Sequence, residues 1–202
     1  MIEIIKTMLF LFAVIDPLGS VPVFLEATKN FNDTTKKKIA IKATIIASVI
    51  LLIFILVGQL IMETMHITLP AFQISGGLIL FLFSLTMIFG EGKPEEEKHL
   101  IKDYEHVTVF PIAIPSIASP GAIMAVVILT DNHIYTYKQQ AVTSLLVLLV
   151  MSITCIILLL AKNIQKHLGE SGILVLSKIM GLILASFAIQ NILLGIKQYF
   201  NI

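Results

Sequence analysis

Six apolar stretches, separated by short polar segments, account for most of this sequence. Each has the roughly 20 residues that an α-helix needs to cross the hydrocarbon of a bilayer. They are residues 4–25, 39–62, 69–90, 107–130, 141–161 and 173–197. The 202 residues are 57% hydrophobic and 13% charged, whereas about a quarter of the residues in a soluble domain are charged. The sequence therefore predicts an all-α integral membrane protein with six transmembrane helices.

The lysines gather on one side of these six spans. The side with the connections after spans one, three and five carries eleven lysines, when residues just inside the helix ends are counted. The other side carries three, Lys6, Lys138 and Lys197. Cytoplasmic loops of membrane proteins are rich in lysine and arginine. We therefore expect both termini on the outer side, which is the periplasm in a cell that has one.

Two spans are interrupted near their middle by residues that break helices. The first contains Asp16-Pro17-Leu18-Gly19-Ser20-Val21-Pro22, and the fourth contains Pro115-Ser116-Ile117-Ala118-Ser119-Pro120-Gly121. Proline lacks a backbone donor and disfavours helical backbone in the residue before it, so each pair of prolines should unwind about a turn. Asp16-Pro17 and Ser119-Pro120 are also good helix starts. We expect half-helices to begin near Pro17 and Pro120, with N-termini that meet near the bilayer midplane.

The two halves of the chain are similar to each other. A shift of 104 residues places Gly77-Leu78-Ile79-Leu80 on Gly181-Leu182-Ile183-Leu184, and a shift of 103 places Asp16-Pro17 on Ser119-Pro120. Because each half has three spans, the second half would enter the membrane in the opposite orientation. We therefore predict one membrane domain, 1–202, made of two inverted three-helix repeats, 1–92 and 107–202, with a linker at 93–106. Secondary transporters commonly have this arrangement.

Unwound backbone at membrane depth is tolerated only inside protein or beside a water-filled cavity, so the two breaks predict a central polar site. Its expected members are Asp16, Gly19, Ser20, Ser116, Ser119 and Gly121, with Pro17, Pro22, Pro115 and Pro120 as the helix breaks. N–H groups at helix starts suit a carboxylate, while Asp16 or unwound carbonyls suit an ammonium group. Together they describe a zwitterion site for a small amino acid. Asp16 has two other possible roles, a helix cap and a proton carrier.

Several classes of function fit this sequence poorly. It has no arginine, so bidentate binding of a phosphate or carboxylate by a guanidinium group is not available. Its net charge of +1 does not favour binding to nucleic acid. Its five histidines lie in or beside loops without the spacing of ligands, so we predict no metal and no cofactor. An intramembrane enzyme such as a lipid phosphatase also fits poorly, because the sequence has no histidine at membrane depth and no Ser–His pair. A channel or exporter for another small metabolite, and a scaffold that transports nothing, remain alternatives.

Six further polar side chains lie inside spans, and we expect them to form hydrogen bonds between helices rather than to line the cavity. They are Gln73, Ser75, Ser84, Thr86, Gln190 and Asn191.

The two interrupted segments resemble signatures of the MarC family of membrane proteins. Residues 16–24, from Asp16 to Phe24, resemble the family's first-helix signature, and residues 111–123, from Pro111 to Ile123, resemble its fourth-helix signature. The family has a glycine where Ser119 stands. The length and the six spans also agree, so the resemblance covers nearly the whole chain.

The resemblance implies a bacterial or archaeal inner-membrane protein. It is similar to neutral amino acid transporters of the SnatA type and distantly similar to the LysE exporter superfamily. This implies a secondary transporter for glycine, alanine or similar solutes, with coupling to protons or sodium left open. We do not carry over the family's association with antibiotic resistance.

Overall fold

The computed structural model describes residues 2–89 and 104–200, and every regular element in them is helical. The elements are α1 (Ile2–Ile15), α2 (Ser20–Ala27), α3 (Asp33–Thr64), α4 (Leu69–Phe89), α5 (Tyr104–Val107), the π-helical segment η1 (Thr108–Ile117), α6 (Pro120–Ile128), α7 (Tyr137–Leu159) and α8 (Ala161–Phe200). Five described stretches are long and apolar enough to cross a membrane. The pair Tyr104–Ile117 and Pro120–Ile128, bent by 54°, makes six if it is one span. The predicted six-span, all-α fold is confirmed.

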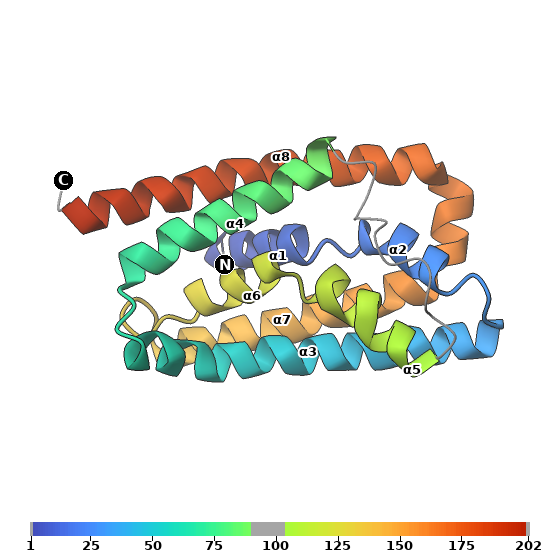
Figure 1. The fold of residues 1–202 in the computed structure, drawn as a ribbon, viewed down its shortest axis with the longest axis horizontal. Coiled ribbons are helices and arrows are strands. Elements are labelled where there is room, and N and C mark those ends of the chain that lie inside the picture. The colour runs from blue at the N-terminus through green and yellow to red at the C-terminus, as the bar shows by residue number, and fades with distance from the viewer. Residues whose placement is uncertain (1, 90–103, 201–202) are drawn as a thin grey trace.

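The helices form two layers with the interrupted helices between them. In Figure 1, α4 and α8 lie side by side along one face, and α3 lies beside α7 along the opposite face. Between these layers, α1 packs against α6, and α2 packs against η1. The first part of each interrupted helix therefore lies beside the second part of the other. This pairing brings the two breaks to the same level of the molecule.

The outward faces of the long helices are apolar, as contact with lipid requires. Leu56, Leu82, Leu145 and Leu193 each leave more than half of their surface exposed. By contrast, Ile15, Val21, Ile117 and Ala118, which flank the two breaks, are at most 1% exposed. The core of the protein therefore surrounds the breaks.

Two glycines bring α4 and α8 into close, antiparallel contact. A Cβ atom at Gly77 would lie 2.5 Å from Ile192 Cγ1 and 2.9 Å from the carbonyl oxygen of Ala188. A Cβ atom at Gly181 would lie 3.0 Å from Ile88 Cγ1 and 3.1 Å from the carbonyl oxygen of Ser84.

The shift of 104 residues seen in the sequence exchanges these two sets of contacts. It carries Gly77 to Gly181, and it carries Ser84 and Ile88 to Ala188 and Ile192. Reciprocal contacts between antiparallel helices are what two inverted repeats would produce. The repeat boundaries, and inversion over the whole chain, stay predictions.

The polar segment between the fifth and sixth apolar stretches, residues 162–172, is helical on both sides of Gly169 and belongs to α8, which bends at that glycine, where φ is 68°. Glycine adopts this backbone without a steric penalty and so permits the bend. Most of the predicted linker, 93–106, lies outside the described residues, and its last three residues belong to α5. Asn32 caps α3, because its Oδ1 accepts the Thr35 N–H at 2.8 Å.

Candidate functional site

Asp16 ends α1 and also caps the turn that leads into α2. Its φ of 48° is left-handed, a conformation that the short polar side chain of Asp tolerates better than most. Its N–H donates to the Phe12 carbonyl at 3.0 Å, and its own carbonyl accepts the Ser20 N–H at 3.1 Å. Its carboxylate oxygen Oδ1 accepts the Gly19 N–H at 2.9 Å. The helix-cap role left open for Asp16 in the sequence is therefore present.

The first break, residues 16–19, unwinds about one turn, as the two prolines predict, but α2 starts later than expected. Residues 17–19 form a turn, and α2 begins at Ser20, three residues after the predicted start at Pro17. Pro22 lies within the first turn of α2, where its missing N–H costs little. The Val21 N–H instead donates to the Leu18 carbonyl at 3.1 Å.

The second break follows the prediction closely at the start of α6. Ser119 Oγ accepts the Ala122 N–H at 3.1 Å, and Pro120 is the first residue of the helix. Before the break, η1 contains extended backbone at Phe110 and Ile114, the residues that precede Pro111 and Pro115. A residue before proline avoids helical backbone, which accounts for both positions.

The two breaks meet through their serines. Ser116 Oγ donates to Ser20 Oγ at 3.0 Å, although the two residues are 96 positions apart. Ser20 Oγ also lies 3.1 Å from the Asp16 carbonyl oxygen and 3.2 Å from the Ser116 carbonyl oxygen. Because one hydroxyl has one proton to donate, these two carbonyls share it.

The polar side chains of the breaks are sealed inside the protein. Asp16 is 3% exposed, and Ser20, Ser116 and Ser119 are each 1% exposed. The structure therefore brings Asp16, Gly19, Ser20 and Ser116 together in the core, with Ser119 three residues beyond Ser116.

The two glycines of the predicted site are closely packed. A Cβ atom at Gly19 would overlap the carboxylate of Asp16. A Cβ atom at Gly121 would lie 2.9 Å from Leu80 Cδ2 of α4 and 3.7 Å from Ser119 Oγ. Gly19 therefore makes room for the capping carboxylate, and Gly121 faces α4. Their contact with a ligand stays a prediction.

Most of the other polar side chains in the spans bond within their own helix. Ser75, Ser84 and Thr86 donate to carbonyls three residues earlier, and Asn191 donates to a carbonyl four residues earlier. The expectation that these four bond between helices is wrong, because hydroxyl and amide groups can reach the preceding turn of their own helix.

The likeness to known proteins extends over nearly the whole chain. The sequence profile described as MarC family integral membrane protein matches residues 1–200. The chain belongs to the MarC family. The predicted family is thus confirmed, whereas the resemblance of residues 16–24 and 111–123 to particular signatures stays a prediction.

Relatives of this MarC family protein occur in bacteria and archaea. A UPF0056 membrane protein of Buchnera aphidicola subsp. Schizaphis graminum is 34% identical over 98% of both chains. One from Methanocaldococcus jannaschii is 33% identical over 93% of this chain and 92% of its own. One from Pyrococcus horikoshii is 36% identical over the full length of both chains. No solved structure matches this chain. Family and helices together make it a multi-pass integral membrane protein.

A second buried acid, Asp131, lies just beyond α6 and is 1% exposed. No role was predicted for it from the sequence. The one sequence signal is its position directly after an apolar span.

Proposed function

We propose that this MarC family protein is a secondary transporter for small neutral amino acids, and that it works by alternating access around the two breaks. The observation that carries the proposal is the contact between Ser20 and Ser116, which joins the start of α2 to the end of η1 in the core beside Asp16. An acid in the middle of a span is costly, and such residues usually serve transport or binding.

Acceptors for an ammonium group lie at the first break and just before the second helix start. The Asp16 carboxylate supplies a negative charge, and the carbonyls of Asp16 and Ser116 share one hydroxyl proton. Because the Ser20 hydroxyl can donate to only one of these two carbonyls at a time, an ammonium group that enters here would donate to the other. This explains how a positively charged group would be held without a metal or a second acid.

Donors for a carboxylate are the backbone N–H groups at the helix starts. The side chains of Asp16 and Ser119 already accept the N–H groups of Gly19 and Ala122, three residues further on. Pro17 and Pro120, which follow the two capping residues, have no N–H. The remaining donors at these positions are the N–H groups of Leu18 and Gly121, where the helix dipole adds positive charge. Acceptors and donors so arranged suit a zwitterion.

The surroundings of the breaks favour a small solute. Ala113, Ala118 and Ala122 are buried around the second break, and Gly121 is in close contact with Leu80. A bulky side chain would have to displace these packed groups, whereas glycine or alanine would displace few of them. The burial of the polar groups also supports a closed state between two openings rather than a permanent water-filled channel.

Uptake of labelled glycine and alanine into proteoliposomes tests this proposal. Asp16→Asn is the informative variant, because Asn also caps helices and tolerates left-handed backbone but carries no charge. Asp33→Asn, at the exposed start of α3, is the matched control. We expect saturable uptake by the wild type and the control, and at least a tenfold loss in Asp16→Asn.

Gradients of pH and of sodium, imposed in turn, identify the coupling ion. Absence of saturable uptake by folded wild-type protein would contradict the proposal. Ion currents without saturation would indicate the channel alternative. Full uptake by Asp16→Asn would leave Asp16 as a helix cap alone.

A further inference from the structure

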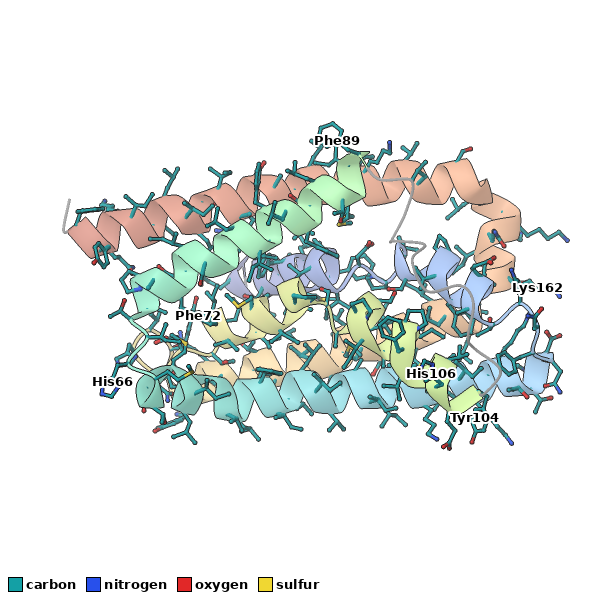
Figure 2. All side chains as sticks on the ribbon, in the orientation of Figure 1. His66, Phe72, Phe89, Tyr104, His106 and Lys162 are labelled. Atoms are coloured by element: carbon teal, nitrogen blue, oxygen red, sulfur yellow. The ribbon has the colours of Figure 1, made fainter. Side chains whose placement is uncertain are left out.

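A second polar cluster lies at the end of the molecule that carries the α3–α4 loop, where Figure 2 labels His66. It consists of Gln59 and Glu63 of α3 and of Asp131 and His133 in the loop between α6 and α7, and we call it the loop cluster. Asp131 is 1% exposed and Gln59 is 8% exposed, whereas the side chain of His133 is 67% exposed. A buried acid and a buried amide therefore meet an imidazole that reaches water.

His133 Nδ1 has two neighbours with opposite hydrogen-bonding roles, one an acceptor and the other a donor. His133 Nδ1 lies 3.2 Å from Asp131 Oδ1, which can only accept when it is ionised. The same nitrogen lies 3.3 Å from Gln59 Nε2, which can only donate. Nδ1 donates to Asp131 when it carries a proton, and it accepts from Gln59 when it does not. The proton decides which hydrogen bond forms.

The Gln59 amide cannot resolve this conflict simply by turning over. Its Nε2 also donates to Glu63 Oε1 at 3.1 Å. A reversed amide would point its oxygen at His133, but it would also place that oxygen against the carboxylate of Glu63. The two states of the nitrogen are therefore distinct states of the cluster.

The buried oxygens of the cluster give a second sign that a proton is bound here. Within the described residues, Asp131 Oδ2 and Gln59 Oε1 are buried and have no hydrogen-bond partner. A buried acceptor without a donor is costly, and a positive charge on the adjacent imidazole offsets part of this cost at Asp131. A hollow of about 510 Å³, lined in part by Glu63, His66 and His133, gives water a route to the ring.

We propose that the loop cluster is a proton-binding site that controls whether the α6–α7 loop is bonded to α3. Without the proton, Gln59 donates to His133 Nδ1 and ties the loop to α3. A proton taken from water onto Nδ1 turns this bond into one from His133 to Asp131, which lies in the same loop. The loop is then released from α3. This inference does not depend on the solute or on the site at the breaks.

The other titratable groups around the cluster do not replace His133 in this role. Burial raises the pKa of the Tyr135 phenol, and the negative charges of Glu3 and Asp131 raise it further, so this phenol stays neutral at physiological pH. Lys138, in the first turn of α7, is exposed and is an ammonium group rather than an imidazole. His66 lines the same hollow and is a second imidazole beside it. It therefore has to be distinguished by experiment.

Nuclear magnetic resonance of the full chain in lipid nanodiscs, with labelled histidine, tests the proposal. The His133 ring signal is assigned as the one that disappears in His133→Gln, and its midpoint is measured as the pH changes. Gln59→Leu removes the bond of the unprotonated ring, so the midpoint should rise. Asp131→Asn removes the charged partner of the protonated ring, so the midpoint should fall. The shift in Asp131→Asn should be about one pH unit, as expected for one charge-assisted hydrogen bond, and the shift in Gln59→Leu should be smaller, because that bond joins two neutral groups.

His66→Gln is the control, and it should leave the His133 midpoint in place. Shifts of opposite sign in the two cluster variants support the proposal. Shifts of the same sign, or no shift in either variant, overturn it. If Asp131→Asn does not fold, Gln59→Leu decides alone: a rise supports the proposal, and an unchanged or lower midpoint overturns it.

Discussion

At the scale of single residues, Asp16 has a structural role that is separate from the one proposed for it in binding. It ends α1 in a left-handed conformation and caps the turn before α2 through Oδ1. A cap alone does not require a charge, because Asn or Ser would serve as well. The carboxylate, 3% exposed in the middle of a span, is therefore the strongest residue-level support for the proposed binding of a positively charged group.

Ser119 gives a residue-level prediction about the second break. Its hydroxyl accepts the Ala122 N–H at 3.1 Å. Ser119→Ala should cost about 1 kcal/mol of folding free energy, whereas Ser119→Gly should cost only a few tenths, because glycine adopts the cap backbone easily. Thermal unfolding in detergent measures both, and 1 kcal/mol corresponds to about 2–4 °C in a protein of this size.

Ser152→Ala is the control for that comparison, because Ser152 is exposed on α7 and bonds only back to Leu148. If Ser119→Ala destabilises the protein no more than Ser152→Ala does, the hydroxyl is not acting as a cap.

At the scale of the elements, the sequence located both interrupted spans because proline, glycine and capping residues act locally. The start of α6 at Pro120 follows directly from these rules. The helical structure of residues 162–172 was not predictable from these rules. The lysines and glycines of this segment are typical of a loop, yet the chain is helical on both sides of Gly169. Local rules place breaks well, but they cannot tell a bend within one helix from a loop between two.

The pair α4 and α8 gives a prediction at this scale. Gly77→Ala and Gly181→Ala should both destabilise the protein, because each added methyl group would press on a backbone carbonyl of the facing helix. Overpacking of this kind costs roughly 1–3 kcal/mol. Gly77→Ala should cost more, since its Cβ would lie 2.5 Å from Ile192 Cγ1, compared with 3.0 Å from Ile88 Cγ1 for Gly181→Ala.

The control for these two variants is Gly172→Ala, whose Cβ would lie 3.4 Å from Leu168 Cβ, an ordinary contact. Thermal unfolding of the three variants in detergent checks the prediction. If Gly172→Ala destabilises the protein as much as the other two do, close packing between α4 and α8 is not the cause.

At the scale of the whole molecule, helix pairing positions the site. The contacts of α1 with α6 and of α2 with η1 bring Ser20 to Ser116. The sequence predicted that the two breaks would meet, but it could not name the residues in contact. Nor could it show the link from Asp131 and His133 to Gln59, because Gln59 lies on α3, 74 positions before His133, and no local pattern joins it to their loop.

The distribution of lysines gives a prediction about orientation. Figure 1 shows both chain ends in the same half of the molecule, and Figure 2 labels Lys162 at the opposite end. Lysine-rich ends stay in the cytoplasm, so both termini should lie outside it. Alkaline phosphatase, which is active only outside the cytoplasm, should be active when fused after Ile202 and inactive when fused in the connection after Leu159. The reverse pattern would contradict this orientation.

The contact between the two breaks at Ser20 and Ser116 can be tested by a disulfide placed between them. In a Cys155→Ser background, the double variant Ser20→Cys/Ser116→Cys should form an intrachain bond on mild oxidation, because the two hydroxyl oxygens lie 3.0 Å apart. Mass spectrometry after alkylation counts the thiols that remain. Ser20→Cys/Ser75→Cys is the control, since Ser75 is exposed on α4. We predict loss of both thiols in the first variant and none in the control, whereas two alkylated thiols in folded, oxidised Ser20→Cys/Ser116→Cys protein would contradict the account.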